Sequence, residues 1–201
     1  MFSNFKDIDS GYRQMRRITL ITIAANLIIT CLSINMVSGS KNKAYVLADG
    51  TLLEATLTDR RDIIPVIAKS HIRTFHQYFW TLDPDEKGIR DNIGKALYLA
   101  DGSAKTLFDD LREAGYYAAI ISGNVSQTVT VDSISLDTRQ YPYLFKCWST
   151  EHLIRPTTRT TRRLITTGQL RTTGGSPNNQ LGFLIEKLHV LDNNDISTEK
   201  R

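Results

Sequence analysis

Residues 18–37 read ITLITIAANLIITCLSINMV and carry no charged side chain. At a rise of about 1.5 Å per residue, a helix over this stretch reaches about 30 Å, the thickness of a hydrocarbon core. The stretch therefore predicts one transmembrane helix. A cleaved signal peptide is the nearest alternative, because Ser38, Gly39 and Ser40 supply small residues, but its apolar region usually spans about 7 to 15 residues. A buried soluble helix is disfavoured, since the remaining chain is too small to surround it.

The basic residues around this segment predict its orientation. Several precede it, namely Lys6, Arg13, Arg16 and Arg17. The nearest bases after it are Lys41 and Lys43. Because such residues are enriched on the cytoplasmic side, residues 1–17 are expected to form a cytoplasmic arm, with the main domain outside the cytoplasm. The net charge of +4 and the pI near 9.1 therefore partly reflect topology.

Polar residues in the segment share one face of the predicted helix. They are Thr19, Thr22, Asn26, Thr30 and Ser33. Their spacing of three or four residues confines them to an arc of roughly 80°. In lipid, such groups can bond to a second helix, each bond contributing on the order of 0.6 to 2 kcal/mol. We therefore predict self-association through this stripe. The alternative is that the hydroxyls bond to their own helix, which explains Asn26 less easily.

The rest of the chain has the composition of one globular domain. The 201 residues are 41% hydrophobic and 23% charged, which excludes a disordered or fibrous chain and a multi-domain enzyme. Residues 38–44 predict a polar linker, and Asp49-Gly50 indicates a hairpin at the start of a domain over residues 45–192. Residues 193–201 show no apolar periodicity and are expected to form a flexible tail.

Helical periodicity precedes strand periodicity within this domain. The predicted helices cover residues 62–80, 83–100 and 103–114, and the predicted strands cover residues 125–136, 143–154, 162–170 and 183–191. Asp83 is expected to cap the second helix, with Pro84 at its first position. Because the strands follow one another across short turns, they predict an antiparallel meander. The fold class is therefore α+β, with three helices packed on one face of a curved four-stranded antiparallel sheet.

No catalytic or metal-binding motif is present in the sequence. Cys31 lies in the predicted span and Cys147 in a strand, so they are not expected to form a disulfide. The histidines lack metal-ligand spacing and clustered carboxylates; they are His71, His76, His152 and His189. His71 lies on an apolar helix face and is expected to be a core residue. Phosphate-binding loops and nucleophile elbows are also missing, so we expect no cofactor, metal or catalytic residue.

The run over residues 155–173, RPTTRTTRRLITTGQLRTT, contains no acid. Its bases are Arg155, Arg159, Arg162, Arg163 and Arg171. Such a run is a candidate for contact with a partner or with single-stranded DNA, because arginine and threonine both donate to phosphates. The alternative is protection of an exposed sheet edge by charge. The run has no interleaved aromatic residues for base stacking, which weakens the DNA hypothesis.

Three stretches carry a resemblance to a known family. They are HIRTFHQYFWTLDPD at 71–85, GNVSQ at 123–127 leading to VDS at 131–133, and NNQLGFLIE at 178–186. Together with the N-terminal anchor, they make the chain resemble the TraK proteins of Bacteroides-type conjugative transposons over nearly its whole length. This resemblance implies a subunit of a conjugative type IV secretion apparatus, similar to the bitopic inner-membrane component of VirB-type machines. It also implies a cone-like periplasmic domain of the nuclear-transport-factor class.

The resemblance implies assembly and no catalysis. The expected partners are further copies of the chain and other channel subunits, with possible transient contact with transferred single-stranded DNA. An enzyme or ligand-binding module is the alternative, because cone-like α+β folds elsewhere enclose a pocket. Asp132 is the only acid within the first long strand. Its convergence with a tyrosine or histidine in an open cavity would favour an enzyme, whereas a filled core is the simpler expectation.

Overall fold

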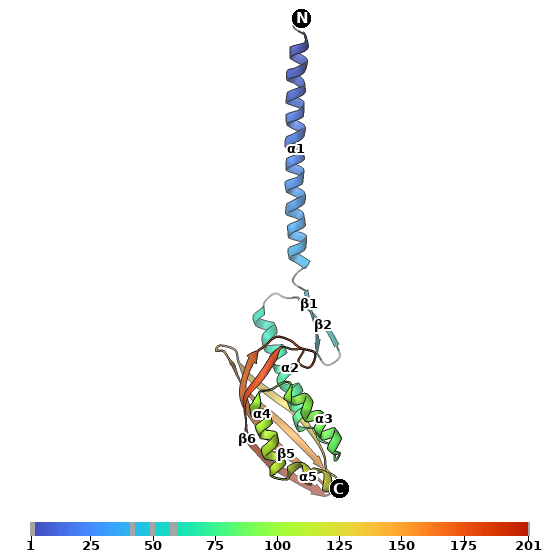
Figure 1. Cartoon of the computed structure of the whole chain (residues 1–201), viewed down its shortest axis with the longest axis vertical. Coiled ribbons are helices and arrows are strands. Elements are labelled where there is room, and N and C mark those ends of the chain that lie inside the picture. The colour runs from blue at the N-terminus through green and yellow to red at the C-terminus, as the bar shows by residue number, and fades with distance from the viewer. Residues whose placement is uncertain (1–2, 41–42, 49–50, 57–59, 201) are drawn as a thin grey trace. The chain divides into compact units, whose positions relative to one another are not determined.

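A computed structural model of the chain describes the backbone of residues 3–40, 43–48, 51–56 and 60–200 and the side chains of residues 15–34 and 63–200 (Figure 1). The chain divides into two compact units, Met1–Asp59 and Arg60–Arg201. The sequence predicts a domain that begins at residue 45. The division falls later, so the hairpin belongs to the first unit.

The first unit contains helix α1 (Ser3–Ser40) and a hairpin of β1 (Lys43–Ala48) and β2 (Thr51–Thr56). The part of α1 from Met15 to Ile34 is long and apolar enough to cross a membrane, with a mean hydropathy of 1.9, and none of it is buried by protein. Helical hydrogen bonding continues beyond this apolar stretch at both ends. Helix α1 therefore includes most of the predicted arm over residues 1–17. The cytoplasmic location of this arm stays a prediction.

The predicted linker over residues 38–44 is wrong at both ends. Residues 38–40 close α1, and Lys43 already pairs with Thr56 across the hairpin. Cross-strand pairing draws residues 43 and 44 into β1, and residues 41 and 42 lie outside the described residues. The hairpin itself is confirmed, with Ala48 opposite Thr51. Its predicted Asp49-Gly50 turn lies outside the described residues.

The second unit is an α+β domain, which confirms the predicted fold class. Its helices are α2 (Arg60–Trp80), α3 (Glu86–Leu97), α4 (Gly102–Glu113) and α5 (Tyr116–Ser122). Its strands are β3 (Ser126–Asp137), β4 (Tyr143–Ile154), β5 (Thr158–Thr172) and β6 (Phe183–Lys200). The strands pair antiparallel in the order β3-β4-β5-β6, as a meander requires. Figure 1 shows the helices on one side of this sheet, with α5 at the lower end of the domain.

The helix starts depend on carboxylates that accept backbone hydrogen bonds. Asp85 caps α3 by accepting from the Gly88 N–H at 2.7 Å, so the predicted cap at Asp83 is wrong. Asp83 instead accepts from the Ser126 hydroxyl at 3.2 Å and so joins the loop to β3. Gly115, with φ of 76°, starts the short helix α5, which the sequence did not predict because seven residues are too few to show a helical period.

One core joins the helices to the sheet. From α2 it takes Ile72, Phe75 and Phe79, which are fully buried. Along β4, alternate residues point inward and are buried, namely Phe145, Cys147, Ser149, Glu151 and Leu153. The alternation follows from the twofold repeat of a strand. An acid at one of these inward positions is unexpected in an apolar core.

The predicted flexible tail is also wrong. Residues 193–200 form the second half of β6, which pairs with β5 as far as Lys200 opposite Thr158. Cross-strand polar contacts replace apolar burial here: the Thr160 and Thr198 hydroxyls lie 3.2 Å apart, and Asp195 accepts from Arg162 at 2.6 Å. Because this half of an edge strand is mostly exposed, it needs no apolar period, and sequence periodicity could not detect it.

Candidate functional site

The polar stripe of α1 bonds to its own helix. The hydroxyls of Thr19, Thr22 and Thr30 donate to carbonyls four residues earlier, at 2.8–3.0 Å. The Asn26 amide does the same toward the Thr22 carbonyl at 2.9 Å. Ser33 is exposed on the same helix. The three threonines and Asn26 therefore bond to their own helix, as the alternative describes for the hydroxyls, and the role of the stripe in self-association stays a prediction.

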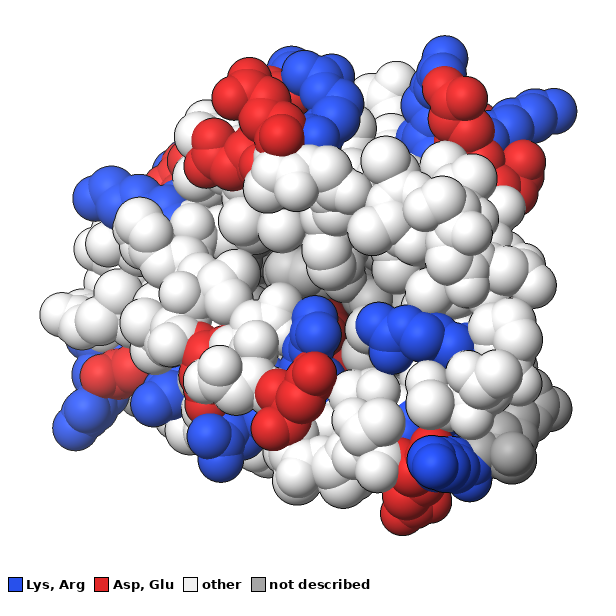
Figure 2. Space-filling model, turned by 90° about the horizontal axis from the view of Figure 1, so that it is seen from below, with Lys and Arg blue, Asp and Glu red and all other residues white. Residues whose placement is uncertain are grey.

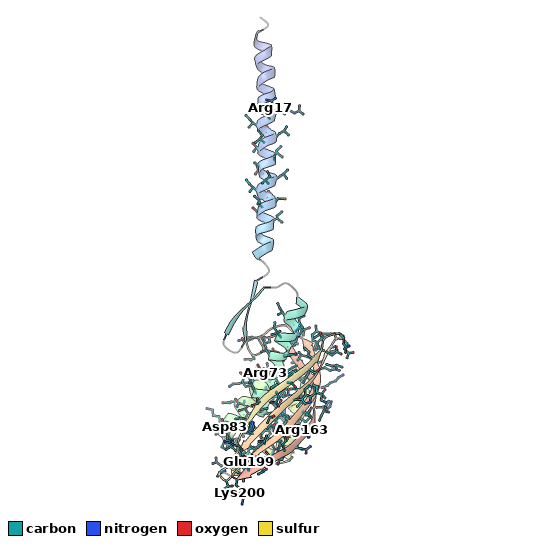
Figure 3. The ribbon with its side chains drawn as sticks, turned by 180° about the vertical axis from the view of Figure 1, so that it is seen from behind. Arg17, Arg73, Asp83, Arg163, Glu199 and Lys200 are labelled. Atoms are coloured by element: carbon teal, nitrogen blue, oxygen red, sulfur yellow. The ribbon has the colours of Figure 1, made fainter. Side chains whose placement is uncertain are left out.

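The arginine run does not form one basic surface. Its strand, β5, lies between β4 and β6, so the interpretation of the run as edge protection is wrong. Arg163 donates to Asp192 at 2.6 Å and Arg171 donates to Glu186 at 2.5 Å, both across to β6. Figure 3 shows Arg163 on the face of the sheet turned away from the helices. These two charges are thus balanced on the outer face.

The remaining arginines lie in different surroundings. Arg159 is exposed and has Glu199 opposite in the strand register. Arg155 is half-buried and donates to the Thr160 hydroxyl at 3.2 Å. Arg162 points inward, where its Nε donates to Asp195 at 2.6 Å and only 19% of its side chain is exposed. Of the five candidates, the structure therefore brings Arg155 and Arg162 to one site.

Glu151 is the most unusual residue of the domain. It is fully buried on the inner face of β4, directly opposite Arg162 on β5. Neither of its carboxyl oxygens has a hydrogen-bond partner among the described residues. Burial raises the pKa of Glu151 to about 7, although the charge of Arg162 acts in the opposite direction. The negative charge of Asp195, which pairs with Arg162, adds to the increase in the pKa.

A chain of hydrogen bonds lies beside Glu151. The Tyr116 hydroxyl at the start of α5 donates to the Gln127 side-chain oxygen at 2.5 Å, and the Gln127 amide donates to the Trp80 carbonyl at 2.9 Å. Burial and then the charge of Glu151 raise the pKa of Tyr116. The phenol is therefore a hydrogen-bond donor and not an acid near neutral pH. These bonds join α2, β3 and α5 around the buried carboxyl.

A cavity of about 320 Å³ lies between α5 and the sheet, and we call it the arginine cavity. Its lining includes Tyr116, Ile120, Val125, Leu153, Arg155 and Arg162. Figure 2 looks onto the end of the domain that carries α5 and shows a hollow near its middle, with basic side chains at the border. The cavity thus combines apolar walls with two cations.

A second hollow, of about 430 Å³, lies among α3, α4 and α5, and we call it the helix groove. Its floor is apolar and aromatic, with Ile89, Phe108, Tyr117 and Ile121. Arg90 and Arg112 lie at its rim, the latter 5.5 Å from the centre of the Phe108 ring. An apolar floor with charged borders has the composition of a protein interface.

The two buried histidines have structural partners. His76 Nδ1 donates to the Ile72 carbonyl and Nε2 accepts from the Thr166 hydroxyl, both at 2.7 Å. Burial lowers the pKa of His76 to about 4. His71 Nε2 donates to the Leu99 carbonyl at 3.0 Å. His71 is thus a core residue, as expected, and the described side chains hold no cluster of three or more potential metal ligands.

Among the described residues, Asp132 does not show the convergence with a tyrosine or histidine that would favour an enzyme. Asp132 is exposed beside the β-bulge of β3 and accepts from the Thr150 hydroxyl at 2.8 Å. The buried acid is Glu151 instead, which sequence reasoning missed. The signal was available, because Glu151 shares the inward parity of Phe145 and Cys147 in the strand that the sequence predicts.

Solved structures share this fold. The α+β domain matches the soluble domain of the TrwG type IV secretion protein from Bartonella grahamii, with a TM-score of 0.53 and 18% identity over 64% of this chain and 94% of that chain. A TrwG component from Bartonella birtlesii matches with a TM-score of 0.51 and 15% identity, covering 63% and 91% of the two chains. Comparison with protein-family models and with curated proteins finds no match.

A third neighbour broadens this fold class. An IcmL-like type IV secretion protein from Legionella pneumophila matches with a TM-score of 0.51 and 13% identity, covering 69% of this chain and 94% of that one. At such identities the likeness establishes the fold alone. The domain therefore has the architecture of the soluble domains of type IV secretion components.

Proposed function

We propose that the chain is a non-enzymatic structural subunit of a conjugative type IV secretion apparatus in the bacterial inner membrane. One observation carries the proposal: a domain with the fold of the TrwG soluble domain, matched over 94% of that chain, follows a helix able to cross a membrane. The N-terminal arm lies in the cytoplasm and the α+β domain in the periplasm. The resemblance to the TraK proteins of conjugative transposons supports the place in a DNA-transfer machine.

Assembly is supported by the surface of the domain. The helix groove offers an apolar floor on which an apolar segment of another subunit, or of a second copy, can pack. The anchor confines each copy to one membrane, so weak contacts act at a high effective concentration. The absence of an Asp132 acid–base pair removes the specific support for an enzyme.

Contact with transferred DNA has less support. Arg162, Arg163 and Arg171 are each paired with an acid on β6. Phosphate contact would have to break these pairs. The free energy of binding would therefore be smaller than for a surface of unpaired arginines.

Site-specific photocross-linking tests this assembly. A photoreactive residue at position 121, in the floor of the helix groove, is compared with one at position 144 on the outer face of β4. Ile121 and Leu144 form a matched pair, since their exposed fractions are 38% and 40%. We expect position 121 to capture the chain itself or other secretion subunits in mating cells, with much less capture at 144. Equal capture at both positions would contradict a role for the groove.

Topology and function are tested separately. A phosphatase fused after residue 201 is expected to be active, because the enzyme folds only outside the cytoplasm, and the mature chain should still begin before residue 18. Deletion of the gene should abolish conjugative transfer, with recovery on expression of the full chain. A cytoplasmic reporter signal or undiminished transfer would each overturn the proposal.

A further inference from the structure

The arginine cavity has the composition of a small-molecule site. We propose that it binds a small organic carboxylate, whose anionic end contacts Arg155 and Arg162 and whose apolar part lies against Ile120, Val125 and Leu153. This inference does not depend on the proposed secretion role. It concerns a site that has no part in anchoring or in the helix groove.

The two arginines retain donors for such a ligand. A guanidinium has five N–H donors. Among the described residues, Arg155 uses Nη1 for the Thr160 hydroxyl and Arg162 uses Nε for Asp195. Their other N–H groups have no acceptor in the part of the chain that the structure describes. A carboxylate matches the planar fork of a guanidinium, so it is a suitable acceptor for these donors.

The size and walls of the cavity restrict the ligand. A volume of about 320 Å³ is near the lower end of the range for small-molecule sites. An oligonucleotide is too large. Free phosphate would fit, but it would leave the apolar walls without a contact. A carboxylate with a compact apolar body can contact both the arginines and the apolar walls.

Glu151 does not line the cavity but lies next to it, since its register partner Arg162 is one of the lining residues. It is fully buried, unpartnered among the described residues, and directly opposite Arg162. The charged groups that act on it are Arg162 on β5 and Asp195 on β6, and its own charge acts on Tyr116 of α5. With Glu151 protonated, the charges of Arg162, Asp195 and the second cavity arginine, Arg155, sum to about +1, and with Glu151 ionised the four groups sum to about zero. An anion in the cavity therefore favours the protonated form.

Binding should consequently strengthen as the pH falls. Burial raises the pKa of Glu151 to about 7, which places its titration between pH 6 and pH 8. A bound carboxylate adds a second negative charge nearby, so the ionised form is further disfavoured. We expect binding at pH 6 to be roughly tenfold tighter than at pH 8. Glu151→Gln should abolish this difference.

A ligand titration tests the proposal on the full chain in detergent micelles. The probe is benzoate, with neutral benzamide of the same shape and inorganic phosphate as comparisons. Saturation-transfer NMR measures binding, with empty micelles as the blank. Arg155→Gln and Ala119→Phe should each weaken benzoate binding at least tenfold, because the first removes a donor and the second fills the mouth at an exposed position of the lining. Thermal melts verify that both variants fold.

The matched control is Arg139→Gln, since the Arg139 side chain is 89% exposed and lies in a turn outside the cavity. Its benzoate affinity should equal that of the unchanged chain. The proposal is overturned if benzoate does not bind at millimolar concentration, if benzamide or phosphate binds as tightly, or if Arg155→Gln has no effect. A pH dependence that survives in Glu151→Gln would overturn the role assigned to that carboxyl.

Discussion

His76 and Glu151 are two buried polar residues of the domain that differ in their hydrogen-bond partners. Both are fully buried. His76 has a partner at each ring nitrogen, at 2.7 Å, whereas Glu151 has none among the described residues. A buried polar group with partners contributes to the fold, while one without partners costs stability. The difference separates a structural residue from one that the fold alone does not explain.

The two residues also respond to acid with opposite signs. Burial lowers the pKa of His76 to about 4 and raises that of Glu151 to about 7. As the pH falls below 6.5, the unfolded chain binds a proton at His76 that the folded chain does not bind. The free energy of unfolding therefore decreases. Between pH 7 and 4.5 the folded chain binds a proton at Glu151 that the unfolded chain does not, so stability is gained. The two contributions largely cancel in the unchanged protein.

The largest expected effect is that of Glu151→Gln. At pH 8 the variant should be more stable than the unchanged chain by about 3 kcal/mol, because it no longer buries a charge. The gain should fall to nearly zero at pH 4.5, where the unchanged carboxyl is protonated. Urea unfolding followed by fluorescence measures this, since both tryptophans, Trp80 and Trp148, lie in the α+β domain.

The control for that change is Glu113→Gln, at an exposed position of α4. Its stability should differ little from that of the unchanged chain at either pH. If Glu151→Gln were less stable than the unchanged chain at pH 8, the buried carboxyl would have an unrecognised partner, and the contrast with His76 would disappear.

The second effect is the loss of stability in acid that His76 causes, and it becomes visible once the Glu151 carboxyl is removed. In the Glu151→Gln background, lowering the pH from 7 to 4.5 should reduce the free energy of unfolding by about 2.5 kcal/mol through His76. Adding His76→Gln should remove most of this loss, although the double variant starts from a lower stability at pH 7. His189→Gln, at an exposed position, serves as the control. An unchanged acid response in the double variant would place the titration elsewhere.

The smallest effect concerns the outer face. Arg163→Gln breaks an ion pair with Asp192 in which 55% of the arginine side chain is exposed. Exposed pairs contribute about 0.2 to 1 kcal/mol, and salt weakens them. We expect a loss below 1 kcal/mol that shrinks further in 0.5 M salt, measured by the same urea unfolding. A loss above 2 kcal/mol would show that the outer-face arginines are as important to the fold as the inner ones.

The contrast between inner and outer residues also explains what the sequence could predict. Strand β4 was predicted with its observed bounds, because alternation from Phe145 to Leu153 is a local signal. The polar half of β6 was missed, since its pairing with β5 is set by partners distant in sequence. The cap at Asp85 was misplaced by two residues, because Asp83 offers the same side chain and only the loop contact with Ser126 distinguishes them.

The candidate site was less accessible to sequence reasoning. The arginine run was visible, but the acids that pair with it, Asp192, Asp195 and Glu186, come from another strand. Their effect depends on register, which composition does not reveal. Glu151 could have been identified by its parity in β4. Its lack of partners and its position opposite Arg162 required the packed structure.

The length of α1 has a mechanical consequence. A continuous helix of 38 residues extends about 57 Å, nearly twice the thickness of a hydrocarbon core. If its apolar part crosses a bilayer, the rest of the helix therefore lies outside the hydrocarbon core. If it tilts by about 20°, its two ends are displaced sideways by roughly 20 Å relative to one another.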